Sequence, residues 1–188
     1  GDYVTYEQDP GGGGGGSTGA IGMDGGNQTI TIKSWVTSDY VIAHETLHVV
    51  GFRHEQQRSD SASWVSKNYA CISDAFQYQV QTDVKLLGIY DYDSIMHYPT
   101  GMFCVDPQPS SCNFSSTDST CKTITRTNGT LIRPPALVTG AATLSREDLN
   151  MIWRMYGTAG GLDEADDHFG AAVAVGDFDG DGYDDVAV

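Results

Sequence analysis

The sequence predicts an α+β fold, and three stretches carry that prediction. Ile30-Thr31-Ile32 alternates apolar and polar side chains, as a half-buried β-strand does. The run from Tyr40 to Val50 is typical of a helix, and Gly51 marks its end. Ser145-Arg146-Glu147-Asp148 has the form of a capping box, and apolar residues recur behind it at helical spacing as far as Tyr156.

The other elements are less regular. Tyr3 to Tyr6 is typical of a strand. Six consecutive glycines, Gly11 to Gly16, predict a flexible loop that packs against nothing. Asp39 stands at the position expected for the N-cap of the first helix. A short helix is expected near Ser73 to Val80, and residues 100–140, rich in Ser, Thr, Pro and Cys, are expected to be mostly loop.

The 188 residues are enough for one medium domain and the start of a second, and we expect the chain to be a fragment at both ends. Its net charge of −15 is concentrated near the C-terminus. Nine acidic residues and no Lys or Arg lie between Asp163 and Asp185, and the rest of the chain carries sixteen acids against ten bases. So acidic a chain is a poor candidate for binding nucleic acid. Since no run of eighteen apolar residues occurs, no membrane span is expected.

Four cysteines, Cys71, Cys104, Cys112 and Cys121, form no C-x-x-C pair. We therefore predict disulfides in an oxidising compartment rather than a zinc knuckle, with all three connectivities open. Three segments also match the N-glycosylation pattern, beginning at Asn27, Asn113 and Asn128.

The stretch from His44 to Glu55 combines metal-ligating residues with helical spacing. Residues four apart share one face of a helix, so the imidazoles of His44 and His48 can converge on one ion. Gly51 breaks the helix and permits a turn that returns His54 as a third ligand. Three protein ligands leave coordination positions open, which is typical of a catalytic rather than a structural zinc.

Glu45 follows the first of these histidines and can reach a water bound to the same ion. Zinc lowers the pKa of such a water from about 15.7 to about 7, so hydroxide becomes available near neutral pH. An amphipathic helix with two surface histidines is the alternative explanation of a lone H-E-x-x-H. Here a glycine and a third histidine follow at fixed spacing, and three of the five histidines fill the pattern, which favours the metal site.

The full pattern resembles the metzincin clan of metallopeptidases, and its flanks resemble the astacin family in particular. Gly51-Phe52-x-His54-Glu55-x-x-Arg58-x-Asp60 extends the motif as that family does. Ser94-Ile95-Met96-His97-Tyr98 matches its methionine turn with the tyrosine that follows, and Leu144 to Tyr156 is similar to its closing helix. The resemblance covers residues 1–157. It implies a metzincin-like fold of two subdomains, here without its first strands and first long helix.

The resemblance also implies roles for single residues. Met96 forms the apolar floor beneath the zinc without ligating it. Tyr98 is a further zinc ligand in the resting enzyme and swings away to hydrogen-bond the tetrahedral intermediate. Glu55 meets the N-terminal ammonium that propeptide removal exposes. Ordinary core packing is the alternative for Met96 and Tyr98, and their place within a five-residue match favours the functional roles.

The acidic tail has a ligand spacing of its own. Asp177, Asp179, Asp181 and Asp185 place carboxylates where they can surround a calcium ion, and Tyr183 stands at the seventh position of the same loop. A strand-like run precedes this loop and another follows it, whereas an EF-hand needs flanking helices and a Glu at the twelfth position.

The tail resembles an FG-GAP repeat, a calcium-binding blade of integrin-type β-propellers. This resemblance implies a β-propeller-type blade fragment over residues 163–188, joined by a linker at 158–162 to the domain over 1–157. Such repeats bury their faces against neighbours, so further FG-GAP repeats are expected beyond the C-terminus. A solvated acidic loop is the alternative.

These features together predict a secreted zinc endopeptidase whose partners are protein or peptide substrates. Glu45 would take a proton from a zinc-activated water that attacks the scissile carbonyl, and would pass it to the leaving amine. Another zinc hydrolase, such as an amidase, is a competing hypothesis, which Tyr98 and the methionine turn disfavour. A calcium-dependent adhesion protein with an inactive protease-like part is another, and the intact His44, Glu45, His48 and His54 disfavour it.

Overall fold

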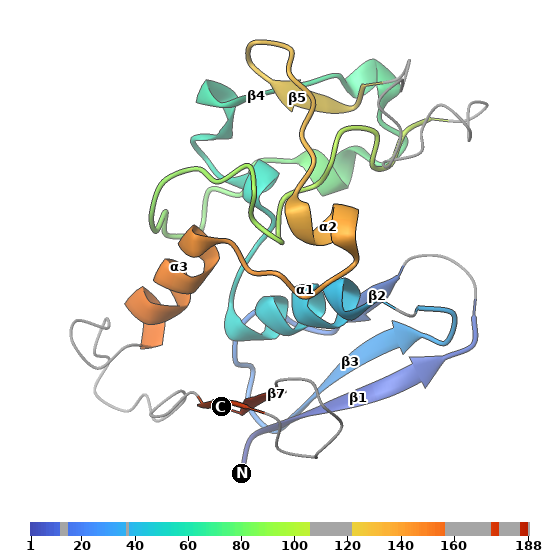
Figure 1. Ribbon diagram of the computed structural model, residues 1–188, viewed down its shortest axis with the longest axis vertical. Helices are drawn as coiled ribbons and strands as arrows, with labels where there is room; N and C mark the ends of the chain where they lie inside the picture. Colours follow the sequence, from blue (N-terminus) through green and yellow to red (C-terminus); the bar gives the residue numbers. More distant parts are fainter. Residues whose placement is uncertain (12–14, 37, 106–121, 157–173, 177–184, 188) are drawn as a thin grey trace. The chain divides into compact units, whose positions relative to one another are not determined.

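The computed structural model describes residues 1–11, 15–36, 38–105 and 122–156, together with two short strands, Ala174–Gly176 and Asp185–Ala187. The chain divides into two compact units, Gly1–Ser145 and Arg146–Val188. Helices and strands mix along the described residues, which confirms the α+β class (Figure 1).

The first unit begins with a three-stranded sheet in the order β1-β3-β2. Strand β1 (Tyr3–Asp9) pairs in parallel with β3 (Asn27–Lys33), and β2 (Gly16–Thr18) pairs antiparallel with the other edge of β3. Side chains alternate between the two faces of β3, so Ile30 and Ile32 point to the same face. There they form a small core with Val49 of the first helix. Both predicted strands are thereby confirmed, and the helix lies across one face of the sheet in Figure 1.

The run of six glycines does not form a loop throughout. Gly16 is the first residue of β2 and pairs with Ile32, and the carbonyl of Gly15 accepts a hydrogen bond from the N–H of Lys33 at 3.1 Å. The prediction that the run packs against nothing is therefore wrong at its C-terminal end. Composition alone indicated flexibility, but the neighbouring β3 offers backbone partners that these glycines can pair with.

Helix α1 spans Asp39–Val50, so Asp39 is the first helical residue and not the N-cap. Ser38 takes the N-cap position in extended conformation, and its hydroxyl donates 2.7 Å to the carbonyl of Gly140. The Ser38 side chain is therefore bonded to a segment about a hundred residues away and does not cap the helix itself. At the other end, Gly51 caps the helix at φ 114°, as predicted, and donates its N–H to carbonyls of the last turn.

Beyond α1 the first unit is built from short elements. Strands β4 (Val65–Lys67) and β5 (Ile124–Arg126) pair antiparallel, and α2 covers Pro135–Thr139. Two one-turn 3₁₀ helices precede β4 and two follow it, at Glu55–Gln57, Ser61–Ser63, Tyr69–Cys71 and Ala75–Tyr78. This part has its own core, formed by Val65, Ile72, Tyr78, Tyr90, Tyr98, Ile124 and Ile132.

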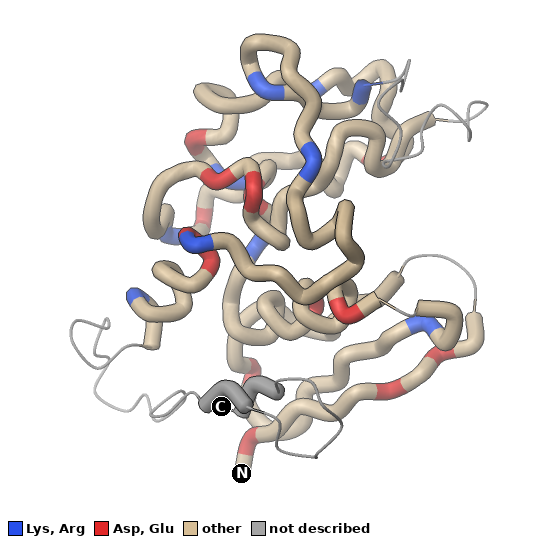
Figure 2. The backbone as a smooth tube through the Cα atoms, in the orientation of Figure 1, with Lys and Arg blue, Asp and Glu red and all other residues tan. Residues whose placement is uncertain are grey.

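Two of these elements differ from expectation. The helix predicted near Ser73 to Val80 is only the 3₁₀ turn Ala75–Tyr78, which begins where the Asp74 carboxylate accepts the N–H of Phe76 at 3.1 Å. Residues 100–140 contain β5 and α2 in addition to loop. Figure 2 shows that the basic residues are scattered along the described part of the chain.

The second unit contains α3 (Arg146–Tyr156), at the place that the capping-box pattern predicts, and an antiparallel pair of strands. These strands are β6 (Ala174–Gly176) and β7 (Asp185–Ala187), and they flank the acidic stretch as expected. Among the residues that the structure describes, no helix is long and apolar enough to cross a bilayer.

Candidate metal centre and active site

Three imidazoles meet at the C-terminal end of α1. His44 and His48 lie one turn apart on the buried side of the helix, and the turn at Gly51 brings His54 back towards them. The Nε2 atom of His54 lies 3.2 Å from Nε2 of His44 and 3.2 Å from Nε2 of His48. Their ligand atoms thus form one cluster, which is the group of potential metal ligands found among the described residues.

The second ring nitrogen of each imidazole, Nδ1, lies within hydrogen-bonding distance of an oxygen atom. Nδ1 of His44 lies 2.8 Å from the carbonyl oxygen of Ile95, and Nδ1 of His48 lies 2.8 Å from that of Phe52. Nδ1 of His54 lies 3.3 Å from Oε1 of Gln57. A carbonyl oxygen only accepts hydrogen bonds, so each Nδ1 is the protonated nitrogen and each Nε2 presents a lone pair.

The electrostatics of the cluster favour neutral rings. Burial, and then the neighbouring His48, lower the pKa of His44 to about 3. Burial is also the main reason why the pKa values of His48 and His54 are lowered, in the case of His54 with help from the other two rings. Three inward lone pairs in one buried place repel one another unless a cation lies between them.

The cluster fits zinc. Zn–N bonds of about 2.0–2.1 Å in tetrahedral geometry place two ligand nitrogens about 3.4 Å apart, close to the spacing of these Nε2 atoms. An oxygen acceptor behind each imidazole is the usual support of zinc-binding histidines. His44, His48 and His54 therefore suit the ion that their spacing predicted.

Glu45 lies on α1 beside the first histidine, and it is 8% exposed. Burial raises the pKa of its carboxyl group to about 7. Among the described residues, no hydrogen bond or ion pair holds this carboxylate. Such a group is suited to exchange a proton near neutral pH, as a general base or acid does.

The methionine turn lies directly behind the cluster. Met96 is 1% exposed, and its carbonyl oxygen accepts the N–H of Glu55 at 3.1 Å. The carbonyl of Ile95, one residue earlier, is the oxygen that orients His44. The turn thus ties the first ligand to the segment that carries the third.

Tyr98 lies against His54. Its ring centroid is 4.3 Å from that of His54, and its hydroxyl donates to Oε1 of Gln77 at 2.9 Å. Burial, followed by nearby charges and phenols, raises the pKa of the hydroxyl, so it stays protonated and can donate a hydrogen bond. Its predicted role as a zinc ligand stays a prediction.

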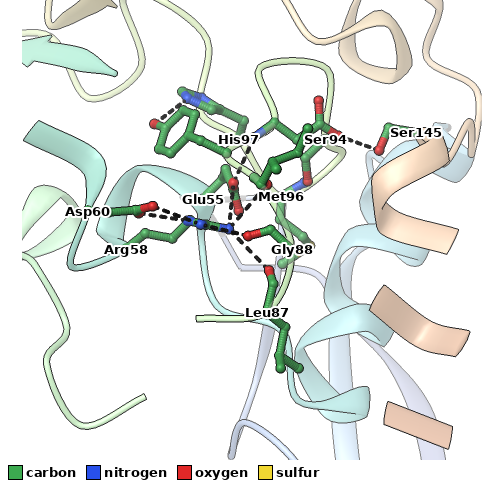
Figure 3. Close-up of polar contacts among 12 residues, drawn as sticks. Glu55, Arg58, Asp60, Leu87, Gly88, Ser94, Met96, His97 and Ser145 are labelled. Atoms are coloured by element: carbon green, nitrogen blue, oxygen red, sulfur yellow. Dashed lines mark hydrogen bonds and ion pairs between the residues drawn. The ribbon is translucent and has the colours of Figure 1, made fainter. Parts of the chain in front are cut away.

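A buried arginine holds the loop that leads into the methionine turn (Figure 3). The Arg58 guanidinium donates to both carboxylate oxygens of Asp60, at 2.9 and 3.0 Å, and to three consecutive carbonyls of residues 87–89. It also lies 3.3 Å from the Glu55 carboxylate, which accepts the N–H of Asp91 at 2.8 Å. Glu55 therefore links the His54 segment to this loop, and its predicted contact with an N-terminal ammonium stays a prediction.

Other predicted residues lie outside the described part of the chain. They include Asp177, Asp179, Asp181 and Tyr183, while Asp185 begins β7 without a described side chain. Cys104 is disulfide-bonded. Cys112 and Cys121 lie outside the described residues, so the disulfide pairing stays open.

Sequence reasoning missed the oxygen atoms that orient the ligands. The carbonyls of Ile95 and Phe52 are backbone groups, which no residue type marks. Gln57 follows the histidine motif and Gln77 lies in the expected short helix, and no pattern in the sequence distinguished either of them from other polar residues. Arg58 was noticed only as part of a family motif.

Comparison with known proteins gives a coherent result. The family model described as Astacin, a family of peptidases, matches residues 1–157, and that of the FG-GAP repeat matches residues 169–188. Zinc metalloproteinase nas-12 from Caenorhabditis elegans is 38% identical over 82 residues, which cover 42% of this chain and 21% of the relative. High choriolytic enzyme 1 from Oryzias latipes is 36% identical over 88 residues, which cover 45% of this chain and 33% of the relative.

A solved structure agrees with these relatives. It is that of High choriolytic enzyme 1, a hatching enzyme zinc-protease from medaka fish. The match has a TM-score of 0.63 at 27% sequence identity and covers 82% of this chain and 68% of that one. The chain spans between a fifth and a third of the length of the two curated relatives.

Proposed function

Because this chain belongs to the astacin family of peptidases, we propose that it is a zinc-dependent endopeptidase. The observation that carries the proposal is the cluster of His44, His48 and His54, whose Nε2 atoms lie 3.2 Å apart in two pairs while each Nδ1 faces an oxygen. Relatives named zinc metalloproteinase and choriolytic enzyme support it.

The chain's own residues divide the work of hydrolysis. A bound zinc supplies Lewis-acid polarisation of the scissile carbonyl and lowers the pKa of water at the site. Glu45, buried and without a competing partner among the described residues, accepts the proton of the attacking water and returns it to the leaving amine. Tyr98, whose hydroxyl donates to Gln77 in this structure, would be a further ligand of a bound zinc at rest, and during the reaction its hydroxyl would donate to the developing oxyanion.

We propose extracellular proteins as the substrates and secretion as the localisation. The disulfide at Cys104 supports both, because structural disulfides persist in oxidising compartments. Glu55 holds the loop before the methionine turn, and it would also receive an N-terminal ammonium after propeptide removal.

Removal of the metal tests the function. Casein hydrolysis by the protein is expected to stop when a zinc chelator removes the ion and to return when zinc is added back.

Glu45→Gln is expected to keep zinc bound but to lower kcat by at least about a hundredfold, the low end for lost acid–base catalysis. Metal analysis and initial rates on casein measure the two quantities.

The Glu45→Gln substitution has a matched control in Glu147→Gln, on α3 and outside the proposed chemistry, which should keep full activity. Near-normal turnover by zinc-loaded Glu45→Gln would show that another group is the base. No hydrolysis by the zinc-loaded wild-type protein on any peptide would refute the endopeptidase itself.

A further inference from the structure

The orientation of the Glu45 side chain has no polar support among the described residues, although its carboxylate must point at one place to exchange protons. Steric contacts must therefore determine where this side chain lies. One of its walls is strand β2, the edge strand that lies alongside α1 (Figure 1). The residue of β2 that faces Glu45 is Gly16.

The contact between Gly16 and Glu45 leaves no room for a side chain. A Cβ atom built on Gly16 would lie 2.8 Å from Cγ of Glu45, closer than real Cβ contacts allow. It would also lie 3.1 Å from Cδ1 of Ile32 and 3.1 Å from Cγ1 of Val41. Cγ is in the middle of the glutamate side chain, so relieving the overlap must move the carboxylate with it.

We infer that Gly16 is a positioning residue for Glu45. Because Gly16 has no side chain, the side chain of Glu45, the proposed base, can occupy the space beside it. The inference rests on the proposed function. It gives the last glycine of the six-residue run a role that flexibility does not explain, since Gly16 is paired in the sheet and has no positive φ. A backbone of ordinary conformation needs no glycine, whereas this contact does.

The test compares Gly16→Ala with Gly19→Ala. Gly19 lies just after β2, also lacks a positive φ, and has no heavy atom within 4 Å of a built Cβ. Both changes reduce the freedom of the unfolded chain equally, and only Gly16→Ala introduces an overlap. We expect Gly16→Ala to keep zinc and to lower kcat about ten- to a hundredfold with KM changed much less, as displacement of a catalytic group by about 1 Å does.

A thermal-melting cycle with Glu45→Ala covers the case in which Gly16→Ala folds poorly. Glu45→Ala removes Cγ without removing a zinc ligand, so the loss in Tm caused by Gly16→Ala should shrink in this background, leaving only the part due to the contacts with Ile32 and Val41. A double variant that folds where Gly16→Ala alone does not supports the same conclusion.

Two results would overturn the inference. One is a zinc-loaded Gly16→Ala with the kcat of Gly19→Ala. The other is a loss in Tm, or a failure to fold, that persists unchanged in the Glu45→Ala background, since the overlap would then be with Ile32 and Val41 alone. Both are separate from failure of the proposed function, in which zinc-loaded wild-type protein is itself inactive or Glu45→Gln remains active.

Discussion

A single oxygen atom beside Nδ1 determines the state of each imidazole in the cluster. The oxygen that orients His44 belongs to Ile95, which follows it by fifty-one residues, whereas the oxygen that orients His48 comes from Phe52, four residues away. Removing one such acceptor would let the ring rotate or change tautomer, which typically weakens metal affinity or activity ten- to a hundredfold, roughly.

Tyr98→Phe removes one hydroxyl and leaves the ring packed on His54. We expect the variant to bind zinc nearly as well and to lower kcat by at least about tenfold, because a donor aimed at the oxyanion is lost. Zinc analysis and steady-state kinetics on a peptide measure these effects. Tyr92→Phe is the control, since its hydroxyl bonds the carbonyl of Trp64. Equal kcat in both variants would reduce Tyr98 to a packing residue.

Among the elements, α1 carries the two first ligands, and its termination decides where the third one lies. Gly51 reverses the chain at φ 114°, and the Phe52 N–H then bonds the carbonyl of Leu47 at 2.9 Å. The carbonyl of His48 accepts the N–H of Gly51 at 3.0 Å and also that of Gly22, from the loop before β3, at 2.9 Å. The end of the helix is therefore held by its own turn and by the loop before β3.

Gly51→Ala is expected to destabilise the fold by about 1–2 kcal/mol, because a Cβ disfavours this backbone conformation. It should also weaken zinc binding, because the turn that positions His54 would be strained in the variant. Gly129→Ala is the control, with φ 83° and open space around it, and should lose stability without losing zinc affinity. Urea unfolding and zinc titration separate the two effects. Unchanged zinc affinity in Gly51→Ala would show that the turn tolerates a side chain.

Strand β4 contains a lysine that makes stability depend on pH. The Lys67 ammonium donates to Oγ of Ser61 at 3.2 Å and to the carbonyl of Tyr78 at 2.9 Å, and burial lowers its pKa to about 8. An unfolded lysine keeps its proton to about pH 10.4. Between these values the unfolded chain binds more protons, so the contribution of Lys67 to stability rises with pH.

Lys67→Met should therefore remove this rise. The free energy of unfolding in urea, measured with saturating zinc at pH 7.5 and pH 9.5, is expected to increase with pH more in the wild type than in the variant. Comparison with the variant cancels the contribution of the tyrosines. The same difference between the two pH values in both proteins would contradict a lowered pKa for Lys67.

The whole molecule consists of two units, and the proposed chemistry lies in the first of them. In the second, Asp177, Asp179, Asp181 and Asp185 place four carboxylates within nine residues, and no Lys or Arg lies between Asp163 and Asp185. Without a cation these charges repel one another. A calcium ion would neutralise part of this charge between β6 and β7.

Calcium is expected to protect the C-terminal unit from limited proteolysis while leaving peptidase activity unchanged, because binding to the native state stabilises that state alone. Asp179→Ala should abolish the protection, and Asp184→Ala, at a position without a proposed ligand role, should keep it. Digestion with and without calcium, assayed beside casein hydrolysis, measures both. If peptidase activity fell when calcium was removed while zinc stayed bound, the two units would not be independent.

The sequence by itself determined the features that obey local rules. Helical spacing brings His44 and His48 to one face, and a glycine after the last turn returns His54, so the metal centre could be predicted from twelve consecutive residues. The alternation of β3 and the capping pattern before α3 are equally local.

Only the tertiary structure decided which distant groups complete the site. The Ser38 hydroxyl donates to the carbonyl of Gly140, and Gln77 receives the Tyr98 hydroxyl. Gly16 faces Glu45 because β2 pairs with the edge of β3 nearest the helix. Such contacts depend on packing between segments far apart in the chain, and neither a backbone carbonyl nor the missing side chain of a glycine marks its partner in the sequence.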